Sequence, residues 1–208
     1  MVILGIDAGF SAPGLAVVDC PGINDGYGDV LWTECVRPAP ADKKELRRQG
    51  LSLTHGHAWR IVKIVDRLAE AVAHYRPRVA AVELPTGGAR SASAIRGMAF
   101  STSMTVATLH TLKVPIYHVT PLKSKRGSTA SEKAADKDMV VDAVASCWPI
   151  DWPMLKTASR PDKISCWAIA DALSAALTFI RAERGKVLWT MLDEAGTDQA
   201  LVNNVKAS

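Results

Sequence analysis

Residues 2–18 read VILGIDAGFSAPGLAVV, and this stretch decides the fold. One apolar run ends in the acid Asp7, and a second covers residues 14–18. Between them lie glycine, serine and proline, which form tight turns, so the stretch predicts a β-hairpin. A third strand is predicted at residues 30–36, and the fold therefore begins with an antiparallel meander.

The rest of the chain alternates helices and strands. Apolar residues recur at helical spacing in four segments, and two short apolar runs indicate further strands. The helices are predicted at residues 52–75, 92–112, 132–147 and 162–184, and the strands at 79–83 and 114–119. This order is typical of an α/β protein with a mixed five-stranded sheet flanked by helices. Residues 37–50 carry charges and prolines without apolar periodicity, and we expect an exposed excursion there.

The composition is that of one globular domain. The chain has 208 residues, of which 48% are hydrophobic and 22% charged. Its net charge of +4 is compatible with a polyanionic partner but does not require one. The four cysteines form no Cys-x-x-Cys pair, which argues against a zinc site and a disulfide framework. We expect reduced thiols and a cytoplasmic protein.

No membrane partner is expected. The first residues show no basic region followed by an apolar signal stretch. Residues 164–180 are apolar enough to suggest a membrane span, but Asp171 at their middle would be costly in lipid. A buried helix is predicted there instead.

Three acids stand out as candidates for chemistry. Asp7 and Glu83 end apolar strands, where open α/β sheets place their ligand sites, and Asp171 lies between alanines in an apolar helix. A buried carboxylate needs a partner cation, and clustered carboxylates bind hard divalent cations such as Mg²⁺. The alternative is that Asp7 caps a turn, Glu83 is an exposed strand end and Asp171 pairs with a distant Lys or Arg.

The chain resembles the RuvC family of Holliday junction resolvases over residues 2–180. The resemblance rests on the motifs GIDAG at residues 5–9, VE at 82–83 and ADAL at 170–173. Residues 93–97 resemble the start of the family's dimer-interface helix, and residues 136–140 the start of its basic helix. The resemblance implies an RNase H-like nuclease domain over residues 1–185, followed by a partly disordered extension over 186–208.

The family's activity implies hydrolysis of a phosphodiester bond by a metal-activated water, with two Mg²⁺ ions that Mn²⁺ is expected to replace. Asp7 would bridge the two ions, and Glu83 and Asp171 would each complete the shell of one. The family's fourth ligand stands three residues before the last Asp, where this chain has Ala168. Asp162 is the nearest replacement acid, with helix N-capping as its alternative role.

The resemblance also implies contacts to branched DNA, in particular to a four-way junction bound by a homodimer. The predicted phosphate contacts are Lys123, Lys125, Arg126, Lys133 and Lys137. Lys123 and Lys137 align best with the family's basic positions, and the alternative is a solvated loop. The predicted dimer interface is the helix at residues 92–112. The loop after Glu83 lacks the aromatic that the family often inserts into the junction, which leaves open a broader preference for flaps or forks.

Two rival functions remain. Sugar kinases and actin-like ATPases share the opening motif, but they need a duplicated domain and a second phosphate loop that 208 residues do not supply. A non-catalytic DNA-binding protein of the same fold would explain Ala168 but not the retention of three costly carboxylates. The five histidines show no shared face and are assigned no catalytic role.

Overall fold

The computed structural model describes residues 1–21, 26–37, 48, 53–85, 91–129, 136–148, 150 and 160–182. At its centre lies a five-stranded sheet in the order β3-β2-β1-β4-β5. The strands are β1 (Val2–Asp7), β2 (Gly14–Asp19), β3 (Asp29–Cys35), β4 (Val79–Glu83) and β5 (Ile116–Val119). The first three strands pair antiparallel, whereas β4 pairs parallel with both β1 and β5. The predicted mixed sheet is confirmed.

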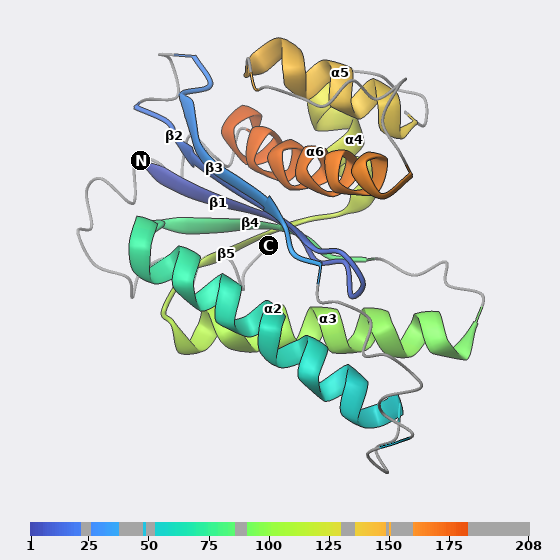
Figure 1. Cartoon of the computed structure of the whole chain (residues 1–208). Helices are drawn as coiled ribbons and strands as arrows, with labels where there is room; N and C mark the ends of the chain where they lie inside the picture. Colours follow the sequence, from blue (N-terminus) through green and yellow to red (C-terminus); the bar gives the residue numbers. More distant parts are fainter. Residues whose placement is uncertain are drawn as a thin grey trace.

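Helices cover both faces of this sheet (Figure 1). They are α2 (Leu53–Tyr75), α3 (Ala92–Thr111), α4 (Pro121–Thr129), α5 (Lys137–Cys147) and α6 (Arg160–Arg181). The helices α2 and α3 lie on one face, and α4, α5 and α6 lie on the other. The molecule is therefore a three-layer sandwich, as expected for an α/β sheet.

Two helical segments differ from the sequence prediction. The helix α4 was not predicted, because its polar sequence PLKSKRGST lacks an apolar stripe. The helix α5 begins at Lys137 and not near residue 132, because the Asp136 side chain caps it by accepting from the Met139 N–H at 2.8 Å. The predicted excursion at 37–50 and the extension at 186–208 fall almost entirely outside the described residues.

The helix α6 is the core helix of the molecule. It packs against β1, β2 and β4 of the sheet and against α4 and α5. Its segment Lys163–Arg181 is long and apolar enough to cross a membrane, with a mean hydropathy of 1.4, yet 72% of its most apolar stretch is buried inside the protein. The apolar composition of α6 is therefore explained by its burial in the protein core, and the buried helix predicted from the sequence is confirmed.

Candidate active site

Two of the predicted carboxylates stand side by side at the ends of neighbouring strands. Asp7 lies opposite Glu83 in the parallel β1–β4 pair, and the Ala8 N–H donates to the Glu83 carbonyl oxygen at 3.3 Å. Side chains alternate between the two faces of a strand, and Ile3 and Val79 belong to the core beneath α6. Asp7 and Glu83 each lie four residues further along, so both face α6.

The helix α6 brings the third carboxylate to the same place. Asp171 lies in the middle of α6 and is only 6% exposed. Two glycines let the helix backbone approach the sheet: a Cβ at Gly5 would lie 2.2 Å from the Ala172 carbonyl oxygen, and one at Gly14 would lie 1.9 Å from that of Ala168. Gly5 within β1 and Gly14 at the start of β2 thus set the distance between Asp171 and the strand-end acids.

The three carboxylates repel one another in a desolvated setting. Burial raises the pKa of Asp7 well above its ordinary value, and the charges of Asp171 and Glu83 raise it further. Burial and the charge of Asp171 raise the pKa of Glu83 to about 7, against a smaller opposing effect of a hydrogen bond with Ser124. The Glu83 Oε2 atom is buried and has no hydrogen-bond partner among the described residues. Such a cluster is poised to accept positive charge.

One lysine reaches into this cluster. The Lys137 Nζ at the start of α5 donates to Asp171 Oδ2 at 3.0 Å. Burial lowers the pKa of Lys137, but Asp171 and the other two carboxylates outweigh this effect and the pKa is raised, so the ammonium stays charged. The same ammonium lies 5.7 Å from the centre of the Trp167 ring, and the Trp167 indole N–H donates to Asp138 at 2.9 Å. Lys137 therefore belongs to the carboxylate centre itself.

The helix α4 supplies the other described basic residues next to the centre. Two hydrogen bonds hold Ser124 against α6. The hydroxyl groups of Ser124 and Ser174 lie 2.8 Å apart, and the Ser174 hydroxyl donates to the Ser124 carbonyl oxygen at 2.8 Å. Lys125 is close enough to lower the pKa of Glu83. Lys123 and Arg126 are exposed on the same helix. Lys133 lies outside the described residues.

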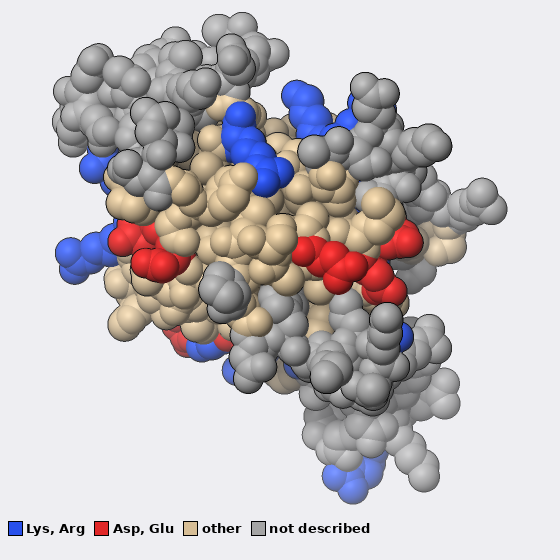
Figure 2. Space-filling model, turned by 90° about the horizontal axis from the view of Figure 1, so that it is seen from above, with Lys and Arg blue, Asp and Glu red and all other residues tan. Residues whose placement is uncertain are grey.

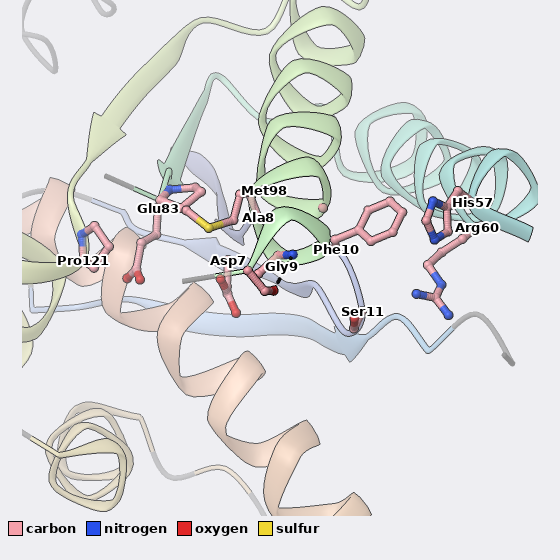
Figure 3. A pocket seen from close by; sticks show the side chains of 14 residues that line it. Asp7, Ala8, Gly9, Phe10, Ser11, His57, Arg60, Glu83, Met98 and Pro121 are labelled. Carbon is pink, nitrogen blue, oxygen red and sulfur yellow. Dashed lines mark hydrogen bonds between the residues drawn. The ribbon is translucent and has the colours of Figure 1, made fainter. Parts of the chain in front are cut away.

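A pocket of about 430 Å³ opens beside the carboxylates (Figure 3). Asp7, Glu83 and Pro121 line one part of it, and Phe10, His57 and Arg60 line another. The two parts come from different layers of the fold, because Asp7 and Glu83 end strands of the sheet and His57 and Arg60 belong to α2. The pocket therefore extends from the acidic cluster to a basic and aromatic wall.

The carboxylates at this site are suitable ligands for divalent cations, but their side chains do not surround a single point closely. Among the described residues no three His, Cys, Asp or Glu side chains converge tightly enough to hold a metal ion as they stand. Asp171 instead contacts Lys137, which supplies a positive charge in this arrangement. Glu83 Oε2 is buried without a hydrogen-bond partner among the described residues, and the pKa values of Glu83 and Asp7 are raised, which fits a site that binds hard cations.

The predicted fourth ligand has no described counterpart. Ala168 is buried, and its carbonyl oxygen packs onto Gly14. Asp162 lies in the first turn of α6, nine residues before Asp171, and its side chain lies outside the described residues.

Comparison with known proteins places the chain in a family, although no family model matches it. The crossover junction endodeoxyribonuclease RuvC of Prochlorococcus marinus strain MIT 9313 is 30% identical over 178 residues, which cover 86% of this chain and 97% of the relative. The chain belongs to the RuvC family. RuvC of Neisseria gonorrhoeae is 29% identical over 195 residues, covering 93% of this chain and 92% of that protein.

Solved structures agree with this RuvC membership. The structure of Thermus thermophilus RuvC in complex with a Holliday junction substrate superposes with a TM-score of 0.65 at 25% identity, covering 89% of this chain and 97% of that one. The structure of T. thermophilus RuvC by itself gives a TM-score of 0.63. The RNase H-like fold implied by the sequence is therefore confirmed.

Sequence reasoning missed the far wall of the pocket. Phe10 follows Asp7 by three residues in the turn after β1, whereas His57 and Arg60 lie about 50 residues further along. His57 and Arg60 are three apart on α2 and so share a helix face, which the sequence pattern could have revealed. Nothing in the sequence, however, indicates that this face meets the turn after β1.

Proposed function

We propose that this protein is a metal-dependent endodeoxyribonuclease that cuts branched DNA, with the four-way junction as its substrate. The observation that carries the proposal is the convergence of Asp7, Glu83 and Asp171 from β1, β4 and α6 around an unpartnered buried carboxylate oxygen. The names of the RuvC relatives and the junction DNA bound by the T. thermophilus protein support the substrate.

Two Mg²⁺ ions, replaceable by Mn²⁺, are the proposed cofactors. When bound, they would supply an activated water and neutralise the charge that develops on the phosphate oxygens. Asp7, whose pKa is raised by the charges of both other acids, would hold the ions together with Glu83 and Asp171. Asp162 is the proposed fourth ligand because it is the nearest acid before Asp171 in sequence. Nine residues place it almost opposite Asp171 on an ideal helix, and capping of α6 is the alternative role.

The basic residues of α4 and α5 would hold the cleaved strand. Lys123, Lys125 and Arg126 on α4 are proposed phosphate contacts, as is Lys133 in the following segment. Lys137 lies against Asp171, so its ammonium would meet the scissile phosphate itself.

A homodimer would present two such centres to the two equivalent strands of a junction. The proposed interface is α3, a helix of 20 residues that has several large apolar side chains exposed. These are Ile95, Phe100 and Val106, with Leu112 just after the helix, each at least 36% exposed. Ile95 and Val106 are eleven residues apart and so lie on nearly the same side of the helix, and exposed apolar side chains of this kind favour a protein contact.

A cleavage assay on labelled four-way junctions tests the proposal. We expect nicks in Mg²⁺ or Mn²⁺ and none in EDTA. Asp7→Asn, Glu83→Gln and Asp171→Asn should each abolish cleavage while leaving junction binding largely intact, because they remove metal ligands and not phosphate contacts. Asp66→Asn, an exposed acid on α2, is the matched control and should cleave normally. Full cleavage by the Asp7 variant would contradict the mechanism.

A further inference from the structure

The far wall of the pocket is built from a cation and aromatic rings that contact one another. The Arg60 guanidinium carbon lies 5.4 Å from the centre of the Phe10 ring, and the His57 ring meets the same ring edge-on at 5.5 Å. Phe100 of α3 supports Phe10 from a third side at 6.1 Å. Figure 3 shows Asp7 and Glu83 in one part of the pocket and His57 and Arg60 in another, with Phe10 between them.

Arg60 has an unmet hydrogen-bonding group in this wall. Its Nε is buried and has no hydrogen-bond partner among the described residues. An unsatisfied buried donor is unfavourable, and the cost is larger for a charged group. Arg60 lines the pocket, so its guanidinium group can meet an anionic ligand there, and the contact with Phe10 limits where the guanidinium can move.

The two ends of the pocket carry opposite charges, and this difference indicates which kind of ligand each end can bind. The carboxylate end repels an anion unless cations are present, whereas the Arg60 end attracts one. A DNA strand that crosses the pocket presents one negative phosphate after another, at a spacing that is fixed along the strand. A backbone phosphate other than the one at the carboxylates can therefore bind Arg60 at the other end of the pocket, through charge-assisted hydrogen bonds.

We propose that Phe10, His57 and Arg60 form a subsite for a backbone phosphate of the cleaved strand, separate from the scissile phosphate. Arg60 binds the phosphate, His57 offers a second ring N–H donor, and Phe10 positions both side chains. This inference rests on the proposed function, because the ligand is the same DNA strand.

Site-specific removal of phosphate charge tests the subsite in the full-length protein. Junction binding is measured by fluorescence anisotropy in EDTA, where no cleavage occurs. One set of junctions carries a single uncharged methylphosphonate at successive positions around the cleavage site. The proteins compared are wild type, Arg60→Gln, Arg60→Lys and Lys63→Gln. Lys63→Gln is the matched control, since Lys63 is an exposed cation on the same helix and does not line the pocket.

We expect Arg60→Gln to weaken junction binding by about tenfold, the size of a lost charge-assisted hydrogen bond. One methylphosphonate position should weaken wild-type binding by a similar factor and should have no further effect in Arg60→Gln, because both changes remove the same contact. Lys63→Gln should keep the wild-type response at every position. Arg60→Lys retains the charge and should keep a reduced response at that one position, which separates lost charge from lost packing.

The outcomes separate this inference from the proposed function. If wild type binds junctions and Arg60→Gln shows the same affinity and the same methylphosphonate pattern as Lys63→Gln, the subsite is wrong and the nuclease proposal stands. The subsite is also wrong if Arg60→Lys loses the position-specific response and Arg60→Gln retains it. If wild type binds no branched DNA in any condition, the proposed function fails, and the subsite fails with it.

Discussion

The single residue Glu83 shows how a carboxylate placed for function lowers the stability of the folded protein. Its carboxylate is held at the end of β4, facing α6, with Oε2 buried and unpartnered among the described residues. Burial and the charge of Asp171 raise its pKa from 4.5 to about 7. The ionised side chain therefore destabilises the ion-free protein at neutral pH.

Replacing this carboxylate should stabilise the protein in a pH-dependent manner. The pKa of Glu83 is higher in the folded state than in the unfolded state, so the folded state binds the extra proton between pH 4.5 and about 7. The destabilisation is absent below pH 4.5, grows as the pH rises through this window, and is complete above it. In EDTA at pH 8, Glu83→Gln should raise the free energy of unfolding by roughly 2 to 3 kcal/mol, with no gain at pH 4.

Urea unfolding of wild type and Glu83→Gln at several pH values measures this gain. Asp66→Asn is the control, because Asp66 is an exposed acid on α2, and its curve should follow that of wild type. A Glu83→Gln gain of equal size at pH 4 and pH 8 would contradict the electrostatic explanation.

The residues of the site differ in how far the sequence reveals them. Asp7 and Glu83 each end an apolar strand, and Asp171 interrupts an apolar helix, so each departs from a simple pattern in its own segment. Arg60 and His57 depart from no pattern, since a cation and a histidine on an amphipathic helix are ordinary surface residues. Their role depends on the packing of α2 near Phe10, which is a tertiary contact that local spacing does not encode.

At the scale of elements, α4 shows why one helix escaped the sequence pattern. It contains Gly127 and several serines, which are poor helix formers, and it lacks an apolar stripe. Its contact with α6 is polar and very close: the Ser124 hydroxyl meets Ser174, and a Cβ at Gly127 would lie 2.3 Å from the Thr178 hydroxyl. Tertiary packing holds this helix, and the sequence pattern of α4 alone does not predict it.

The close approach of α6 to the sheet should be sensitive to a single methyl group. Gly14→Ala places a Cβ 1.9 Å from the Ala168 carbonyl oxygen, so α6 must shift. We expect a loss of about 3 kcal/mol in the free energy of unfolding, together with reduced cleavage, because Asp171 moves with the helix.

Gly97→Ala is the matched control for that substitution. Gly97 lies within α3, where a Cβ would meet Phe10 at an ordinary 3.4 Å and alanine favours the helix. Its stability, measured by urea unfolding, should equal or exceed that of wild type. Equal stabilities for both alanine variants would show that the glycine at position 14 does not set the helix distance.

The placement of α4 also predicts how junction affinity responds to salt. Each phosphate contact contributes about 0.7 to 0.9 to the slope of log affinity against log salt. Lys123→Ala should therefore reduce the slope by roughly one unit, in a fluorescence anisotropy series on a four-way junction. Lys113→Ala, an exposed lysine just beyond α3, should leave the slope unchanged. Identical slopes for both variants would assign Lys123 to the solvated surface.

At the scale of the whole molecule, the described residues form no continuous basic surface on the face that carries α5 and α6 (Figure 2). On that face the acidic side chains of the described residues gather in a few small groups, and the basic ones stand apart from one another (Figure 2). The net charge of +4 is also modest. Non-specific attraction to DNA should therefore be weak, and junction binding should depend on a few positioned contacts and on the pairing of two protomers.

The exposed apolar side chains of α3 predict how that pairing can be broken. Ile95→Glu combined with Val106→Glu should convert the proposed dimer into a monomer, because two charges would be buried in the interface. Val62→Glu on α2, where valine is 54% exposed, should leave the dimer intact. Sedimentation velocity measures both, and a wild-type protein that sediments as a monomer with and without junction DNA would refute the dimer.

The contact between Lys137 and Trp167 gives the candidate site an optical signal of its own. Cations that bind Asp171 would compete with the Lys137 ammonium, which now lies 3.0 Å from that carboxylate and 5.7 Å from the centre of the Trp167 ring. Movement of a charge so close to an indole changes its emission, so a Mg²⁺ titration should alter the intrinsic fluorescence before any DNA is added. Trp167→Phe should remove this change while the other five tryptophans remain. The protein would thus report the filling of its own metal site without a label.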